Sequence, residues 1–436
     1  MTTAVQQTQP GVPGGAPAGA SATATALRLR DWRTPIAFGI FTVIVGILFI
    51  GFGRHGTSTF TFTSLSTDVV HVPDLPVNVW GYGIAATAIA AVMAVVSTAY
   101  IRSRRKVPRW YLALFAFILL VGFLAWSTAD ETLPIIGLLG GALALSVPLI
   151  FGAMGGVMSE RSGVVNIVIE GQLLAGAFVS AVVASTTGSA IAGLVAAAVA
   201  GMLVSFVLAA FSIKYYVDQI IVGVVLNVLV LGLTNFLFST VLSQHPTALN
   251  SPTPLPTLAI PGLSAIPVIG PVLFDQTAIV YVMYVAVAFV FYLLFFTRTG
   301  LRIRSVGEHP RAADTVGINV SSTRFWSVSF GGAIAGIGGA FFTIGSVGAF
   351  SEDVSSGQGY IALAAVIFGG WHPIKATFAA LLFGFANELQ SELSILGSPV
   401  PSQFLLMLPY IVTIIAVAGL VGQSRAPGAD GKPYFK

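Results

Sequence analysis

The sequence predicts an all-α polytopic membrane protein, folded as a transmembrane helical bundle. Of its 436 residues, 56% are hydrophobic and only 8% are charged, whereas soluble domains carry about 25% charged residues. So few charges cannot cover a surface that faces water, and most of the surface must therefore face lipid. In addition, apolar stretches of about 20 residues, the length that crosses a bilayer as a helix, recur along the chain.

Ten apolar stretches have the length of a membrane-spanning helix. We predict that each forms one span. Glycine is abundant in them, and small residues let helices approach closely in lipid, where packing drives association. The spans are expected near residues 36–53, 78–100, 111–129, 133–157, 164–184, 190–213, 219–243, 277–296, 325–349 and 403–422.

The stretch 357–392 has a different pattern. Its two apolar segments, Tyr360–Phe368 and Ala376–Ala386, flank the sequence Gly-Gly-Trp-His-Pro. Each segment is too short to cross the bilayer alone. We therefore predict a re-entrant or broken-helix hairpin, with Asn387 and Glu388 ending its second half.

The chain divides into four parts. The first 27 residues carry no charged side chain and are rich in Ala, Gly, Pro and Thr, a composition that cannot bury a core and is typical of disorder. They also lack the basic start of a signal peptide. The expected parts are a disordered tail (1–35), additional N-terminal spans (36–132), a core (133–422) and a C-terminal tail (423–436).

Positive charge assigns the cytoplasmic side, because short cytoplasmic loops carry an excess of Lys and Arg. Basic residues gather before the first span, after the second, in the segment 297–320 and at the end of the chain. If the spans alternate, all of these lie on one side, and the opposite loops hold many of the acidic residues. We therefore expect both termini in the cytoplasm and the Pro-rich loop 244–276 outside.

The segment 297–320 is the longest and most charged of the expected cytoplasmic loops within the bundle. Pro310 can begin a short helix and Gly317 can end it, while Glu308 lies near the positive end of that helix. A charged helix across the membrane base would suit docking into the groove of a partner. The alternative is a solvated loop whose arginines only fix the topology, and composition alone favours this alternative.

Several motifs resemble those of a known transporter family. Residues 312–318, Ala-Ala-Asp-Thr-Val-Gly-Ile, resemble the coupling element of ABC importer permeases, and residues 155–178 resemble the signature of their branched-chain amino acid, ribose and nucleoside group. Within this group, Ser159–Ile167 is similar to the nucleoside, guanosine-type branch. The resemblance covers roughly 133–436, and its further matches are Glu170 with Gly171, Asp218 with Gln219, Gly223, Asn227, 307–314, 357–365 and 408–410.

The resemblance implies the permease subunit of a bacterial ABC importer for nucleosides, located in the plasma membrane. It implies three partners: a second permease forming a heterodimer, a separate ATPase subunit, and an extracellular substrate-binding lipoprotein. The motion of the ATPase would reach this chain through the short helix near Pro310. The implied coupling residues are Arg304, Glu308, Arg311, Ala312, Ala313, Asp314 and Gly317.

We expect no enzyme activity, no cofactor and no metal in this chain. It has no Gly-x-x-x-x-Gly-Lys-Ser/Thr loop for ATP phosphates, since Gly431-Lys432 is followed by Pro433. It has no cysteine, and its five histidines are scattered without metal-ligand spacing. The small net charge of +4 sits in short loops between spans and gives no reason to expect nucleic acid.

Polar residues at membrane depth are candidate substrate contacts, because burying a charge there costs at least about 2.5–3.5 kcal/mol. Asn166 and Glu170 are four positions apart in the expected span 164–184, so they would share one helix face. They could hydrogen-bond a ribose hydroxyl or a base edge, or Glu170 could be a polar clamp between helices. The predicted substrate pathway comprises Asn166, Glu170, Asn227, Gln358 and Tyr360.

Other readings of these residues stay open. Asn227 has the pattern of interhelical hydrogen bonding, and Glu160 with Arg161 favours a structural role. The Gly-rich stretches 155–171 and 355–370 occupy comparable places in two halves, which hints at an inverted repeat with the pathway at its interface. The cargo could also be a pentose or a branched-chain amino acid, or the chain could be an ion-coupled secondary transporter with Glu170 as proton site.

Overall fold

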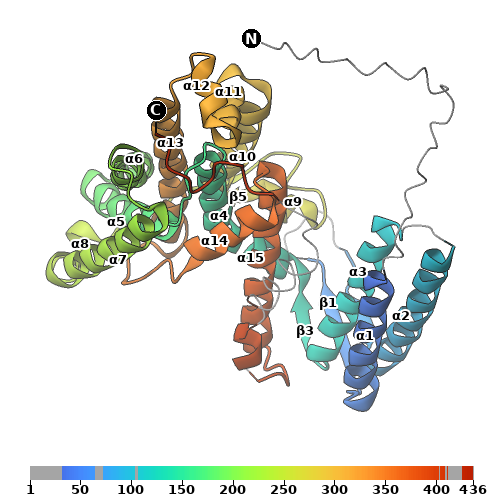
Figure 1. The fold of residues 1–436 in the computed structure, drawn as a ribbon. Helices are drawn as coiled ribbons and strands as arrows, with labels where there is room; N and C mark the ends of the chain where they lie inside the picture. The colour runs from blue at the N-terminus through green and yellow to red at the C-terminus, as the bar shows by residue number, and fades with distance from the viewer. Residues whose placement is uncertain are drawn as a thin grey trace, which may run out of the picture. The chain divides into compact units, whose positions relative to one another are not determined.

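The computed structural model describes residues 32–63, 72–103, 107–401, 403–407, 410 and 425–435. These residues are mostly helical, with two small sheets (Figure 1), and this confirms the predicted all-α membrane bundle. In the described part of the chain, nine helices are long and apolar enough to cross a bilayer, and the tenth predicted span, 403–422, lies mostly outside it. The nine, with their π-helical continuations η, are α1 (Arg33–Gly46) with η1 (Ile47–Gly51), α2 (Val79–Arg102), α3 (Arg109–Ser127), α4 (Ile135–Glu160), α5 (Ile169–Thr187), α6 (Ala190–Ala209) with η2 (Ala210–Lys214), α7 (Gln219–Leu237) with η3 (Phe238–Leu242), α10 (Ala278–Phe296), and α13 (Val320–Ala340) with η4 (Phe341–Val347).

The chain folds as two compact units. The smaller unit ends its first part at Gly53 and takes Gly83–Gly122 as its second, so it contains α1 and most of α2 and α3. The rings of Phe38 and Phe115 stack in its core with centroids 3.9 Å apart. The hydroxyl of Tyr111 donates to a backbone carbonyl of α2, which ties α3 to α2. The remaining residues, Arg54–Tyr82 and Phe123 onward, form the larger unit.

Helix α13 is the central packing element of the larger unit. It packs against α4, α5 and α6, and α4 packs in turn against α14 and α15. Glycine permits these close approaches: a Cβ atom on Gly201 would collide with the backbone of Gly332, and one on Gly155 with that of Gly331. Small residues at such crossings are the usual means by which helices associate in lipid.

The predicted hairpin is present as α14 (Gln358–Phe368) and α15 (Pro373–Ile395). The turn between them uses the left-handed backbone of Gly370 and Trp371, at φ +61° and +54°. The expectation that both halves are short is wrong for the second, because α15 continues past Glu388 and has 23 residues, or about 34 Å of helix. The side chain of Glu388 is accommodated where α4 offers Gly141, which has no side chain to obstruct it.

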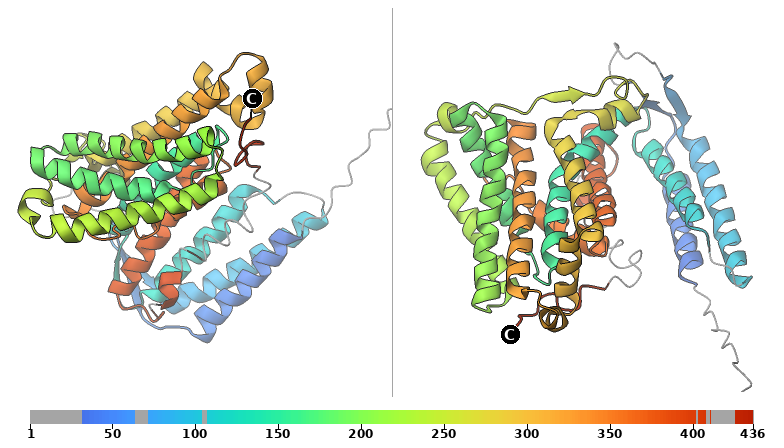
Figure 2. Two further views of the ribbon diagram at one scale, coloured as in Figure 1. Left: turned by 60° about the vertical axis from the view of Figure 1, so that its left-hand side comes forward. Right: turned by 90° about the horizontal axis from the view of Figure 1, so that it is seen from above.

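Two small sheets lie at the loop ends of the larger unit. Strand β1 pairs antiparallel with β2 and parallel with β3, and β4 pairs antiparallel with β5. The Pro-rich loop 244–276 thus contains short regular elements. Seen from above in Figure 2, α9 and the β4 segment lie at one end of the helices, and α11 with α12 at the other, here called the α12 side. These elements are β1 (Thr57–Thr61), β2 (Leu75–Asn78), β3 (Thr132–Pro134), α8 (Pro246–Leu249), β4 (Thr257–Ala259), α9 (Ile269–Phe274), β5 (Asp275–Thr277), α11 (Arg298–Glu308) and α12 (Pro310–Thr315).

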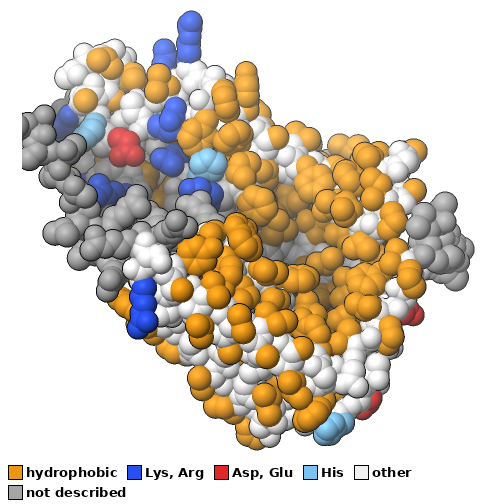
Figure 3. All heavy atoms as spheres, turned by 90° about the vertical axis from the view of Figure 1, so that its right-hand side faces the viewer, with side chains coloured by type: hydrophobic (Ala, Val, Ile, Leu, Met, Phe, Trp, Pro, Cys, Tyr) orange, Lys and Arg blue, Asp and Glu red, His pale blue; other side chains and the backbone are white. Residues whose placement is uncertain are grey.

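The outer faces of the long helices are apolar. Hydrophobic side chains dominate the face drawn in Figure 3. Helix α7 exposes a continuous stripe in which Ile221, Val225 and Val228 are each about 60% accessible. Large contiguous apolar patches are rare on proteins that face water. This surface is therefore suited to lipid and to neighbouring membrane helices.

Candidate functional site

A buried carboxylate joins the start of α5 to the start of α14. The Oε1 atom of Glu170 accepts hydrogen bonds from the Ser355 hydroxyl at 2.6 Å and the Gly357 amide at 2.8 Å, and its Oε2 atom accepts from the Gly359 amide at 2.6 Å. The amides at the beginning of a helix lack partners within the helix and carry partial positive charge. Glu170 therefore neutralises the N-terminal end of α14, as in the polar-clamp alternative.

Asn227 on α7 makes the second connection. Its Oδ1 atom accepts from the Gly171 amide at 2.8 Å, and its Nδ2 atom donates to the Ile167 carbonyl at 2.9 Å and to the Tyr360 hydroxyl at 3.2 Å. Three helices, α5, α7 and α14, are thus held together by polar side chains. We call Glu170, Asn227, Ser355, Gln358 and Tyr360 the polar cluster.

The members of the polar cluster differ in burial and in hydrogen bonding. Glu170 and Asn227 are buried and fully engaged, whereas Tyr360 is 48% exposed. The Oε1 atom of Gln358 is buried without a hydrogen-bond partner, and an unsatisfied buried acceptor costs about 1–3 kcal/mol. Within this cluster, Tyr360 therefore has the accessible side chain and Gln358 the acceptor without a partner.

Asn166 does not belong to this cluster, and its expected place on a helix face with Glu170 is wrong. Helix α5 begins only at Ile169, because residues 161–168 form a turn-rich connection after α4. Asn166 is fully buried there. It exchanges two hydrogen bonds of 3.2 Å with Gln172 and donates to the Ser159 hydroxyl, so it organises the entry to α5.

The end of α4 holds the turn of the hairpin. The buried Glu160 carboxylate accepts a hydrogen bond from the indole nitrogen of Trp371, and the Nε atom of Arg161 donates to the Trp371 carbonyl at 2.8 Å. These contacts agree with the structural role predicted for Glu160 and Arg161. They also explain why Trp371 keeps a left-handed backbone, since its indole N–H and its carbonyl oxygen are both held by α4 and the residue after it.

The short helix expected near Pro310 is confirmed as α12, Pro310–Thr315, and Gly317 follows it at φ +85°. Helix α11 before it was missed. Its signals were present in the sequence: Thr297 caps it by accepting from the Gly300 amide at 3.0 Å, and its buried positions, such as Gly300, Ile303 and Gly307, recur at helical spacing. The high charge of the segment hid this pattern.

The predicted coupling residues have different environments. Ala313 is buried against Val306 and Val320, and Asp314 is half-buried. The guanidinium of Arg304 lies 5.0 Å from the centre of the Phe295 ring, so it faces the body of the protein. The residues that remain on the exposed surface of the α12 side are Glu308, Arg311, Ala312 and Gly317.

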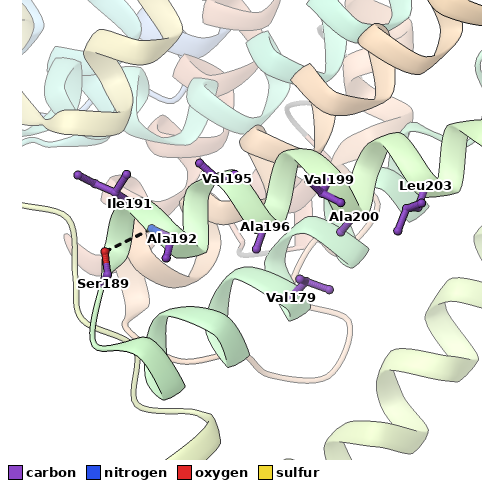
Figure 4. A pocket seen from close by; sticks show the side chains of 9 residues that line it. All are labelled: Val179, Ser189, Ile191, Ala192, Val195, Ala196, Val199, Ala200 and Leu203. Carbon is purple, nitrogen blue, oxygen red and sulfur yellow. Dashed lines mark hydrogen bonds between the residues drawn. The ribbon is translucent and has the colours of Figure 1, made fainter.

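A groove along α5 and α6, with a volume of about 700 Å³, is unsuited to a polar solute (Figure 4). Ser189 is the polar residue of its lining, and its hydroxyl already accepts from the Ala192 amide at the start of α6. The aliphatic lining, which includes Ile191, Val195 and Leu203, fits lipid chains or another membrane helix.

Long apolar helices, an internal polar cluster and short charged helices at one end are typical of a multi-pass membrane protein. Residues 138–417 match the family described as "Branched-chain amino acid transport system / permease component", and the chain belongs to this family. The predicted resemblance is thereby confirmed, and the chain is a transport subunit.

Three of the similar proteins are named as permeases. The chain is 43% identical over 307 residues to the guanosine ABC transporter permease protein NupQ of Bacillus subtilis, covering 67% of this chain and 95% of that protein. It is 41% identical, with the same coverage, to the nucleoside ABC transporter permease protein NupC of Lactococcus lactis. It is 34% identical over 256 residues to the putative glucose ABC transporter permease protein TsgC13 of Haloferax volcanii, covering 58% and 77%. No solved structure matches.

Proposed function

We propose that this chain is the membrane-spanning permease subunit of an ABC importer that carries nucleosides across the bacterial plasma membrane. The observation that carries this proposal is the likeness to two nucleoside permeases, at 43% and 41% identity over 95% of their length. The polar cluster supports it, because a nucleoside offers both a planar ring and hydrogen-bonding edges.

In this proposal, the exposed edge of the polar cluster contacts the solute. The ring of Tyr360 stacks on the base, a contact worth about 1–3 kcal/mol in other proteins. The amide of Gln358 bonds to the base or the ribose, since it has both donors and an acceptor. Glu170 and Asn227 hold these residues in place. Asn166 stabilises the start of α5 through its hydrogen bonds to Gln172.

The α12 side faces the cytoplasm in this proposal, and both termini lie on that side. Arg302 and Arg311 are exposed there, whereas Asp275 lies in β5 at the opposite end, as the excess of basic residues in cytoplasmic loops would require. ATP hydrolysis takes place on a separate ATPase subunit that docks on α12. A second permease and an extracellular substrate-binding lipoprotein complete the transporter.

Reconstitution of the complete transporter in proteoliposomes tests this function. Uptake of radiolabelled guanosine should require ATP, the ATPase and the lipoprotein. Tyr360→Ala should lower uptake about tenfold, as loss of a stacking contact predicts, and Tyr360→Phe should lower it less. Tyr292→Ala removes a tyrosine that is exposed on α10 and serves as the matched control, with uptake unchanged.

Two results would contradict the proposal. Uptake that persists without ATP and collapses with a protonophore would identify an ion-coupled transporter instead. Equal losses of uptake in Tyr360→Ala and Tyr292→Ala would show that the polar cluster does not contact the solute.

A sugar is the second candidate cargo, favoured by the 34% identity to the putative glucose permease TsgC13. Competition distinguishes the two. Excess unlabelled guanosine should abolish uptake of labelled guanosine, and excess glucose or ribose should leave it unchanged. Uptake of labelled glucose or ribose that excess unlabelled sugar abolishes and excess guanosine leaves unchanged, together with no uptake of labelled guanosine, would assign the second cargo.

A further inference from the structure

The described C-terminal residues lie against the α12 side of the larger unit. The amide of Gly428 donates to Glu308 Oε2 at 3.0 Å, and the amide of Ala429 donates to the Gly307 carbonyl at 2.8 Å. Both acceptors belong to the last turn of α11: one is the Glu308 carboxylate, and the other is the Gly307 carbonyl, a group that has no partner within the helix. The tail therefore acts as a cap for α11, immediately before α12.

The same segment surrounds a buried arginine. Arg324, in the first turns of α13, is only 2% exposed. Its Nη1 atom donates to the Lys432 carbonyl at 2.9 Å and its Nη2 atom to the Ala429 carbonyl at 3.5 Å. A buried cation without partners is strongly destabilising. The tail therefore supplies acceptors that the interior at this position needs.

Gly163 allows the C-terminal tail to approach the connection 161–168, which follows α4. Gly163 has φ +89°, and a Cβ atom there would lie 2.7 Å from Arg324 Nη2 and 3.1 Å from the Ala429 carbonyl oxygen. The tail, α13 and the connection 161–168 thus meet at one point. This connection leads directly into α5 and the polar cluster.

Two aromatic residues of the tail make further contacts, one with α11 and α12 and the other with the turn between α6 and α7. Tyr434 packs on Val306 and Ala313, and its hydroxyl hydrogen-bonds the Asp314 side chain of α12. The ring of Phe435 lies 4.6 Å, between centroids, from that of Tyr216 in the turn between α6 and α7. The tail therefore touches α11, α12, α13 and two connections of the core.

We propose that residues 427–435 form a C-terminal clasp that positions α12 and carries its displacement to α13 and to the start of α5. Helix α12 has six residues and is too short to be stable by itself, so its position depends on what packs against it. The clasp bonds to the elements on both sides of α12. This inference rests on the proposed function, in which α12 receives the motion of an ATPase.

Hydrogen–deuterium exchange of the full chain in lipid nanodiscs tests the positioning. A chain ending at Arg425, which lacks the clasp, should exchange the amides of 305–318 at least about tenfold faster than the complete chain. Arg324→Met should do the same, because it removes both donors to the clasp. Arg298→Met, which replaces an exposed arginine of α11, is the matched control and should exchange like the complete chain.

A point substitution in the full-length chain tests the same contact without the risk that the shortened chain misfolds. Tyr434→Ala leaves the main-chain bonds of the clasp in place and removes the contacts of this ring with α12 and with Val306 of α11. It should accelerate exchange in 310–318 and leave exchange in 161–168 unchanged. In the assembled transporter, the shortened chain should transport at least about fivefold less guanosine per ATP hydrolysed.

The outcomes separate this inference from the proposed function. Unchanged exchange in the shortened chain would overturn the positioning by the clasp. Faster exchange with full transport per ATP would overturn its role in transmitting motion. A complete chain that moves no nucleoside would defeat the proposed function alone, since the exchange comparison does not depend on the cargo.

Discussion

Glu170 and Gly359 begin two different helices and face each other across 2.6 Å, the distance from the carboxylate Oε2 to the glycine amide nitrogen. A Cβ atom at position 359 would collide with the backbone of Glu170. The start of α14 is therefore pressed against the start of α5 as closely as a backbone permits. The Gly-rich stretches 155–171 and 355–370 meet here, as the sequence hint of a shared interface requires, although the inverted repeat itself stays a prediction.

Gly359→Ala should destabilise the protein, because the added methyl group forces α14 away from α5. Overpacking of this kind costs about 1–3 kcal/mol. The melting temperature of the purified chain in detergent, followed by intrinsic fluorescence, measures the effect. Gly140→Ala is the matched control: this helical glycine has open space around its Cβ position, and alanine there should be neutral or slightly stabilising. Equal melting temperatures for the two variants would contradict the close approach.

Glu170→Gln should weaken the clamp at the start of α14. A glutamine keeps one carbonyl oxygen, but its amide group cannot accept from the second site, so one of the three hydrogen bonds is lost. Hydrogen bonds to charged groups contribute about 1.5–3 kcal/mol. We expect a lower melting temperature and reduced guanosine uptake that still depends on ATP. Uptake that became insensitive to a proton gradient in this variant, and was sensitive before, would instead make Glu170 a proton site.

The spans were predictable because hydrophobic length alone decides them, and α12 was predictable because Pro310 and Gly317 mark its limits. The position of Asn166 was not predictable. A hydropathy pattern cannot locate the first residue of a helix when the preceding turn is also largely apolar and buried. Residues 161–168, which precede α5, are such a turn.

The C-terminal clasp has no sequence pattern that would reveal it. Most of its bonds run through backbone groups, such as the amide of Ala429 and the carbonyl of Lys432. Main-chain donors and acceptors occur at almost every residue, so no side-chain spacing identifies them. Of the polar cluster, the sequence indicated Glu170, Asn227, Gln358 and Tyr360 but not Ser355. It also did not indicate that the hydrogen-bonding capacity of Glu170 is filled whereas the Oε1 atom of Gln358 has no partner.

Trp371→Phe should destabilise the hairpin turn. The substitution keeps an aromatic ring but removes the indole N–H that the buried Glu160 accepts. A buried group deprived of its partner costs about 1–3 kcal/mol, and more if it is charged. Combining it with Glu160→Met, which removes the acceptor, should give a smaller loss than the sum of the two single changes, because both remove the same bond. Additive losses in such a cycle, measured by thermal unfolding, would show that the two residues are not coupled.

Asp430 should make the clasp sensitive to pH. Burial raises the pKa of this carboxyl from 3.8 to about 7, against the opposing effects of the Gly431 amide and the Arg324 guanidinium. The Glu160 carboxyl of α4 also interacts with it electrostatically. The docked tail therefore holds a proton that the free tail releases near pH 4, so docking is strongest below that pH and weakens as the pH rises to about 7. Well above pH 7 the Asp430 carboxyl is ionised in both the docked and the free tail, so it no longer contributes to the pH dependence of docking.

Site-specific fluorescence on the tail measures this dependence. A dye on a cysteine introduced at the exposed position Lys432 should become more mobile between pH 5 and pH 7. Asp430→Asn mimics the protonated carboxyl and should keep the dye immobile across the whole range. Because Asn and Asp have nearly the same size, a difference between the two chains reports charge rather than packing. An identical pH profile in both chains would assign the transition to another group and remove Asp430 from the docking of the clasp.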